Sequence, residues 1–184
     1  MKSVEVQVAG LTIDPATNMP IVVLRDEDGK WQVPIWIGLV EASAIATQLE
    51  KVELSRPMTH DLMKTVLEKT GTRLEKVEIT ELREDTFYAS LHMLVAGKPV
   101  VLDSRPSDAI ALALRTGARI FVAMSVLEAT AQPADERKGT PKGGEPPPTP
   151  DRPRVADLLA TVPPAEWAKL LEKLSPEDFG KFKM

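Results

Sequence analysis

The sequence predicts an α+β domain with a mainly antiparallel or mixed sheet and three main helices, followed by short C-terminal helices after a Pro-rich linker. Two observations carry this prediction. Short runs of alternating apolar and polar residues recur between hairpin signals, which is typical of half-buried strands. Segments with helical apolar spacing interrupt them, each bounded by cap or stop residues. Hairpin-connected strands interspersed with helices indicate α+β architecture.

The first half of the chain is predicted to hold three strands and then two helices. Asp26-Glu27-Asp28-Gly29-Lys30 is a hairpin signal between two of the strands. Thr59 is the expected cap of the second helix and Gly71 its stop. The expected elements are, in order, strands at 2–13, 20–24 and 31–37 and helices at 40–52 and 59–70.

The second half is predicted to continue the sheet around one further main helix. Glu84-Asp85 joins two of its strands. Pro106 suits the first turn of the helix, where its missing N–H costs nothing, and Gly117 stands where a C-cap belongs. The expected elements are strands at 73–82, 86–95, 99–102 and 119–122, the helix that contains Asp108, and a short helix near 125–129.

The composition divides the chain into a domain at 1–129, a linker at 130–154 and a helical extension at 155–184. The linker holds seven of the sixteen prolines and cannot bury a core. Helical spacing at 155–160 and 165–174 gives the extension an apolar face, on which Trp167 is interpreted as a packing anchor. Two helices of this size cannot form an independent domain.

Hydrophobic residues make up 43% of the chain and charged residues 27%, as in soluble globular proteins. Cysteine is absent, which excludes disulfides, thiolate metal sites and a cysteine nucleophile. No signal-peptide pattern and no apolar stretch of membrane-spanning length occurs, so we expect a cytoplasmic protein without a membrane partner.

The net charge of -4 argues against tight, non-specific nucleic-acid binding, for which proteins present a basic face. Residues 1–130 carry 14 Lys and Arg against 18 Asp and Glu. Aromatic residues amount to 4%, too few for a base-stacking platform. Glycine-rich dinucleotide and Walker motifs, the esterase nucleophile elbow and the zinc-protease motif are also absent.

The most informative stretch is the octapeptide Asp103–Ile110, which places two carboxylates and a guanidinium within six positions at the junction of a predicted strand and helix. Such junctions present free backbone N–H groups and are ready-made anion sites. The Asp–Arg–Asp cluster either holds a phosphate or a metal ion, or it only starts the helix. In the second interpretation Ser104 or Arg105 caps the helix and Asp108 complements its dipole.

Other candidates also stand at element starts. His60 could act as a general base or metal ligand oriented by Asp61, or it could be an exposed residue of a capped first turn. His92, on the polar face of a strand, is interpreted as exposed. Four carboxylates begin helices or flank them: Glu41, Asp61, Asp103 and Asp108. Brought to one edge, they could hold Mg²⁺ or Mn²⁺, which prefer oxygen ligands.

Three blocks in order resemble the bifunctional nuclease domain family. They are VPIWIG at 33–38 with Glu41-Ala42 and Ala44-Ile45, RPMTHDL at 56–62, and DSRPSDAIALAL at 103–114. The ending SPEDFGKF at 175–182 resembles the close of longer bacterial members. The resemblance covers residues 1–129 and that tail.

This resemblance implies hydrolysis of phosphodiester bonds of DNA, RNA or both, with nucleic acid as a substrate that is not tightly bound. The expected catalytic residues are Asp103, Asp108, His60, Asp61 and Glu41, and Asp103 and Asp108 are the expected ligands of Mg²⁺ or Mn²⁺. The expected substrate-binding residues are Arg105, Arg56, Ser104 and Ser107.

The alternative is a non-enzymatic regulatory or protein-interaction module. In it the polar cluster is a network of caps and ion pairs, and the linker and C-terminal helices carry the function. In either case we expect a homo-oligomer, because the edges of a small sheet are usually covered.

Overall fold

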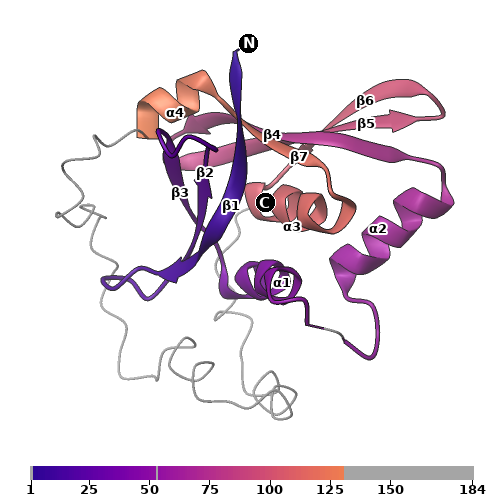
Figure 1. The fold of residues 1–184 in the computed structure, drawn as a ribbon, viewed down its shortest axis with the longest axis horizontal. Coiled ribbons are helices and arrows are strands. Elements are labelled where there is room, and N and C mark those ends of the chain that lie inside the picture. The colour runs from indigo at the N-terminus through magenta and orange to yellow at the C-terminus, as the bar shows by residue number, and fades with distance from the viewer. Residues whose placement is uncertain (1, 53, 131–184) are drawn as a thin grey trace. The chain divides into compact units, whose positions relative to one another are not determined.

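The computed structural model describes residues 2–52 and 54–130, and it confirms the α+β class with a mixed sheet (Figure 1). The described strands are β1 (Ser3–Ile13), β2 (Pro20–Arg25), β3 (Gln32–Trp36), β4 (Arg73–Arg83), β5 (Thr86–Val95), β6 (Lys98–Ser104) and β7 (Arg119–Ala123). The described helices are α1 (Leu39–Leu49), α2 (Thr59–Lys69), α3 (Pro106–Thr116) and α4 (Met124–Thr130). The linker prediction beyond residue 130 and the extension at 155–184 lie outside the described residues.

The seven described strands form one sheet in the order β3-β2-β1-β7-β4-β5-β6. Neighbouring strands pair antiparallel except β4 and β7, which run parallel in the middle of the sheet. A parallel pair needs a crossover connection, and here β5, β6 and α3 supply it. Helices α1, α2 and α3 lie together next to the sheet in Figure 1.

Two of the hairpins depend on left-handed backbone conformations. The β4–β5 turn places Glu84 and Asp85 at φ of 48° and 58°, and the β5–β6 turn places Ala96 and Gly97 at 49° and 76°. Positive φ at both central residues is the geometry whose twist matches the twist of antiparallel strands. These turns fix the register that carries β6 back towards the start of α3.

Helix α3 is the centre of the packing. Eight of its eleven residues are buried, and it contacts α1, α2, β4, β5 and β7. Its three alanines, Ala109, Ala111 and Ala113, let these neighbours approach closely on several sides. Helix α2, by contrast, has no buried residue. The helices in the described ranges include none that is long and apolar enough to cross a membrane.

This difference between two neighbouring helices predicts unequal effects of the same substitution. Leu112→Ala empties a position that is 1% exposed in α3, and we expect it to lower the free energy of unfolding by about 2–5 kcal/mol. Leu62→Ala in α2, where the residue is 58% exposed, should change it by less than about 0.5 kcal/mol. Urea unfolding followed by circular dichroism measures both free energies. Equal losses in the two variants would contradict the difference in burial between α3 and α2.

Candidate functional site

The first turns of three helices meet at one cluster of charged side chains. Glu41 lies in the first turn of α1, His60 and Asp61 in that of α2, and Asp108 in that of α3, which Arg105 precedes. The contacts of α3 with both α1 and α2 bring these starts together. Four of the residues expected from the sequence therefore share one network of hydrogen bonds: Glu41, His60, Arg105 and Asp108. Asp61, next to His60 in the chain, is bonded separately to Arg115.

Arg105 is the centre of the four-residue network. It is the cap residue of α3, with extended backbone, and Pro106 occupies the first helical position. Its Nε donates to Oδ2 of Asp108 at 2.7 Å and its Nη2 to Oδ1 at 3.2 Å. Its Nη1 donates to Oε1 of Glu41 at 2.8 Å. These hydrogen bonds raise the pKa of Arg105, the one with Asp108 most. Arg105 is thus held between two carboxylates from different helices.

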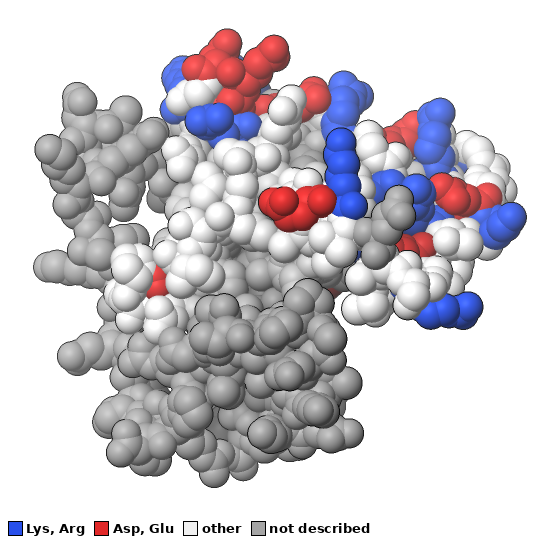
Figure 2. Space-filling model, turned by 60° about the horizontal axis from the view of Figure 1, so that its bottom comes forward, with Lys and Arg blue, Asp and Glu red and all other residues white. Residues whose placement is uncertain are grey.

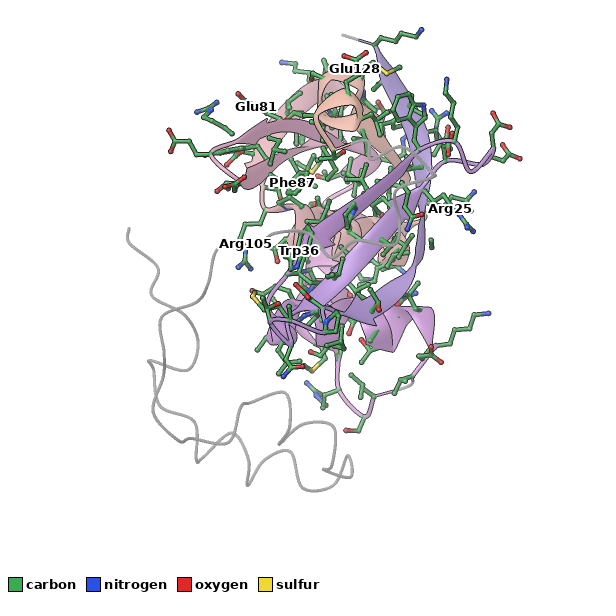
Figure 3. The ribbon with its side chains drawn as sticks, turned by 90° about the vertical axis from the view of Figure 1, so that its left-hand side faces the viewer. Arg25, Trp36, Glu81, Phe87, Arg105 and Glu128 are labelled. Atoms are coloured by element: carbon green, nitrogen blue, oxygen red, sulfur yellow. The ribbon has the colours of Figure 1, made fainter. Side chains whose placement is uncertain are left out.

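Glu41 reaches Arg105 because residue 38 is a glycine. A Cβ at Gly38, the cap residue of α1, would collide with Oε2 of Glu41. The Glu41 carboxylate therefore folds back over the helix start into space that any other residue would fill. Its side chain is 21% exposed, whereas that of Arg105 is 52% exposed. Figure 3 shows the Arg105 side chain reaching outward from the ribbon.

His60 joins the network through Asp108. The distance between its Nε2 and Oδ1 of Asp108 is 3.2 Å, and the imidazole is 12% exposed. The hydrogen bond with His60, helped by Arg105 and opposed by burial, lowers the pKa of Asp108 to about 2. An ionised carboxylate only accepts hydrogen bonds, so Nε2 carries the proton. No described group hydrogen-bonds to Nδ1, which is the nitrogen free to accept a proton when the imidazole is neutral.

Arg115 is a further charged residue near these helix starts, and the sequence patterns did not indicate it. It lies in the last turn of α3, and its side chain is 4% exposed. Its Nε donates to Oδ1 of Asp61 at 2.6 Å, and its Nη1 donates to the carbonyls of Ala44 and Ala111 at 2.9 and 3.0 Å. The signal that could have found it is its spacing: position 115 is two turns after Asp108, on the same face of α3.

Asp61 links Arg115 to the start of α2. Its Oδ2 accepts the backbone N–H of Met58 at 2.9 Å, so Met58, and not the expected Thr59, is the cap residue of α2. Burial raises the pKa of Asp61, but the hydrogen bonds from Arg115 and Met58 outweigh it and the pKa is lowered. Asp61 is therefore an ionised anchor of the helix start.

The remaining expected site residues lie outside the cluster. Asp103 is opposite Ser90 in the β5–β6 pair, so its exposed side chain is on the sheet face opposite to that of Ala89 and Leu91, which are buried. Within the described residues it has no ion pair. Arg56 is exposed in the loop before α2, and it too has no ion pair there.

The two expected serines are engaged in the helix start itself. The Ser104 hydroxyl donates to the carbonyl of Arg105 at 3.1 Å, and Ser107 is only 6% exposed. The octapeptide thus divides into Arg105 and Asp108, which belong to the cluster, and flanking residues that do not.

His92 corrects an expectation. Its side chain is 29% exposed, but Nε2 is buried and lies 3.4 Å from Oε2 of Glu78. Burial lowers the pKa of His92, and Lys76 lowers it further because it is also cationic. His92 lies on the sheet face that carries Asp103, opposite to the buried side chains of β5. It is a partly buried residue and has no contact with the cluster around Arg105.

The carboxylates of the cluster do not form a ready metal site. The described residues contain no group of three or more His, Cys, Asp or Glu side chains that could hold a metal ion. Asp103 and Asp108, the expected ligands, do not share a contact, and the oxygens of Glu41 and Asp108 accept hydrogen bonds from Arg105. Mg²⁺ is often bound by one or two carboxylates plus substrate phosphates, and such a site is incomplete without its substrate.

The surface visible in Figure 2 mixes acidic and basic side chains. They alternate along the upper and right-hand parts of this face, with a largely uncharged area between them. Nothing in this view is a broad, purely basic face of the kind that binds duplex DNA tightly.

The fold and the cluster together define an α+β domain with a charged network at three helix starts. The chain belongs to the bifunctional nuclease domain family, whose model matches residues 22–135. An uncharacterized protein of Mycobacterium tuberculosis is 42% identical over 123 residues, which are 67% of this chain and 73% of that protein.

Plant relatives are more distant. Bifunctional nuclease 2 of Oryza sativa subsp. japonica is 28% identical over 121 residues, 64% of this chain and 37% of that protein. Bifunctional nuclease 1 of Arabidopsis thaliana is 29% identical over 100 residues, 52% of this chain and 31% of that protein. The chain thus matches about a third of each of these plant proteins.

The low pKa of Asp108 predicts a pH-dependent effect of Asp108→Asn. A carboxylate whose pKa is about 2 in the folded state, against an ordinary value of 3.8, stabilises the fold above pH 4. That contribution is lost as the pH falls from about 4 to about 2. We therefore expect Asp108→Asn to lower the free energy of unfolding by about 2 kcal/mol at pH 6, and to have a much smaller effect at pH 2.5.

Urea unfolding of the wild type and the variant at both pH values measures this difference. Asp103→Asn, which removes a carboxylate of the same octapeptide outside the network, is the matched control and should stay within about 0.5 kcal/mol of wild type at pH 6. An Asp108→Asn effect that is the same at both pH values would contradict the pairing of Asp108 with Arg105 and His60.

Proposed function

We propose that this chain hydrolyses phosphodiester bonds of nucleic acids at the cluster formed by Glu41, His60, Arg105 and Asp108. The observation that carries the proposal is the convergence of an imidazole and a half-exposed guanidinium on one ionised carboxylate, in a member of the bifunctional nuclease domain family. The plant relatives bear the name nuclease, and that activity comes to this chain as a proposal.

In this proposal Arg105 binds the phosphate. A guanidinium has five N–H donors, and Asp108 and Glu41 take three of them. The other N–H groups are available to a phosphate oxygen, and the two carboxylates fix the plane in which they point. Stabilisation of the charge that develops on the phosphate is the main catalytic contribution of such a group.

His60 is the proposed general base. Because Nε2 donates to Asp108, the imidazole is held in one orientation and Nδ1 is left to take a proton from water. The water oxygen attacks phosphorus, the bond to the leaving oxygen breaks, and the leaving oxygen takes a proton from solvent. A requirement for Mg²⁺ or Mn²⁺ stays a prediction, and so does the cytoplasmic location.

The test is cleavage of end-labelled single- and double-stranded DNA and RNA with Mg²⁺, Mn²⁺ or EDTA. We expect His60→Gln and Asp108→Asn to lower the rate at least about a hundredfold, the usual contribution of a general base. His92→Gln is the matched control, because His92 is the other histidine of the chain and lies away from the cluster. Its rate should equal that of the wild type.

Asp103→Ala separates the two halves of the octapeptide and should leave the rate within about threefold of wild type, since Asp103 has no contact with the cluster in the described structure. Absence of cleavage under every condition would contradict the proposal. So would a cleavage rate that His60→Gln leaves unchanged. Inhibition by EDTA would show that a divalent cation takes part.

A second candidate is a protein-interaction module, favoured by the outer face of α2. Met58, Leu62 and Val66 repeat every four residues on the side away from α3, and each is more than 50% exposed. An apolar stripe of this kind often marks a binding surface. Absence of cleavage together with folded variants would favour this function over the nuclease.

The expected homo-oligomer has a candidate edge in β6. This strand ends the sheet, and Val101 and Leu102, on its two faces, are 58% and 46% exposed. The strand at the other end, β3, is shorter, with five residues against seven in β6. We propose that a second copy pairs antiparallel with β6, so that Val101 meets its own counterpart.

Val101→Lys tests this pairing, because two lysines would then face each other across the strands. We expect sedimentation velocity to show a dimer for the wild type and a monomer for the variant at the same concentration. Ile13→Lys, at an exposed apolar position at the end of β1, is the control and should stay dimeric. If the wild type stays monomeric even when the protein concentration in the sedimentation run is raised about 100-fold, the pairing is contradicted.

A further inference from the structure

Arg115 is a buried charge that the proposed reaction does not use. We propose that Arg115 is a positioning residue: by holding Asp61 against α1 and α3 it fixes the start of α2, and so it sets the contact between His60 and Asp108. Its effect on cleavage rests on the proposed function, but its effect on the position of His60 does not.

The hydrogen bonds of Arg115 reach three helices at once. Asp61 belongs to α2, Ala44 to α1 and Ala111 to α3 itself. At 4% exposure the guanidinium depends on these partners, because a buried charge without them is strongly destabilising. The three acceptors surround Nε and Nη1, so the fork of the guanidinium defines where Asp61 and the carbonyl of Ala44 must be.

Helix α2 depends on these polar contacts because apolar burial does little to hold it. None of its residues is buried, Leu67 is only partly buried against the core, and its apolar stripe faces away from α3. Its described polar contacts with α3 are Asp61 with Arg115 and His60 with Asp108.

Asp61 transmits the position of Arg115 to the backbone of α2. One carboxylate oxygen accepts from Arg115, and the other accepts the N–H of Met58, the cap residue. His60 is the residue before Asp61 in the same turn, so a shift of this turn moves the imidazole relative to Asp108. Loss of the Arg115 contact should therefore weaken a second contact that Arg115 does not touch.

Lysine at position 115 would keep the charge and lose this geometry. A single ammonium nitrogen cannot occupy the places of both Nε and Nη1, so it cannot hold Asp61 and the Ala44 carbonyl as the guanidinium does. Arg115→Lys is thus the informative variant. Arg119→Lys, at an exposed position where Arg119 is 3.7 Å from Glu5, is its matched control.

The experiment follows the imidazole of His60 by NMR and the amides of α2 by hydrogen exchange in the full chain. His60 and His92 signals are distinguished with His60→Gln. In Arg115→Lys and in Asp61→Asn we expect the His60 signals to move towards those of Asp108→Asn. Amide exchange in α2 should become about tenfold faster or more, because a buried ion pair has lost its geometry or a partner. Arg119→Lys should match the wild type in both measurements.

The double variant Arg115→Lys/Asp61→Asn should exchange at nearly the same rate as either single variant, since all three break one contact. Wild-type His60 signals and wild-type α2 exchange in both Arg115→Lys and Asp61→Asn would overturn the proposal. If Arg115→Lys unfolds the whole domain, faster amide exchange in β4 and β7 will show it. The proposal is then judged from Asp61→Asn alone, because that variant keeps both carbonyl contacts of Arg115.

These readouts keep the positioning role apart from the nuclease. A His60 shift in a protein that never cleaves nucleic acid would support the positioning role and remove only its link to catalysis. Cleavage that depends on His60, with no change of the His60 signals in either variant, would leave the nuclease and overturn the role of Arg115.

Discussion

The burial of α3 is the constraint on which the rest of this domain depends. The helix supplies the crossover between the two parallel strands and is contacted by two helices and three strands. A helix enclosed in this way needs partners for the charged side chains that it carries. Arg105 and Asp108 at its start and Arg115 near its end find them in Glu41 of α1 and in His60 and Asp61 of α2. The charged cluster is thus the result of closing two helices over the ends of a third.

The structural and the ligand-binding interpretation of the octapeptide both apply to Arg105. The backbone of Arg105 is the cap of α3 and its side chain is paired with two carboxylates, as a structural role requires. The same side chain is half exposed and retains unused donors, as a role in phosphate binding requires. A helix start that is rigid because its charges are paired is also a precise support for groups that meet a ligand.

The sequence predicted the order and kind of all the described elements, because hairpin turns and helix stops are local signals. The Glu84-Asp85 turn and Gly117 act within a few residues of themselves. Element ends were less certain: α1 ends at Leu49 and not near residue 52, and Met58 caps α2 because the Asp61 carboxylate reaches back to its N–H.

Only those residues of the site that stand at helix starts could be predicted from the sequence. Glu41, His60, Asp61, Arg105 and Asp108 were found because each stands at a start, and the packing of α3 joined them. Arg115 was missed because it ends a helix and its partners are up to 71 positions away. Asp103 was included by proximity in sequence, but strand alternation turns its side chain to the other face of the sheet.

The way in which α2 is attached has a further consequence. The sheet and α3 cohere through buried apolar surface, whereas α2 is joined to α3 through two carboxylates, a guanidinium and an imidazole. These polar groups lie mostly out of water, so dissolved ions screen them less than they screen pairs on the surface. The helix that carries His60 therefore keeps its place only while these side chains stay paired, whereas the core that supports it does not depend on charge.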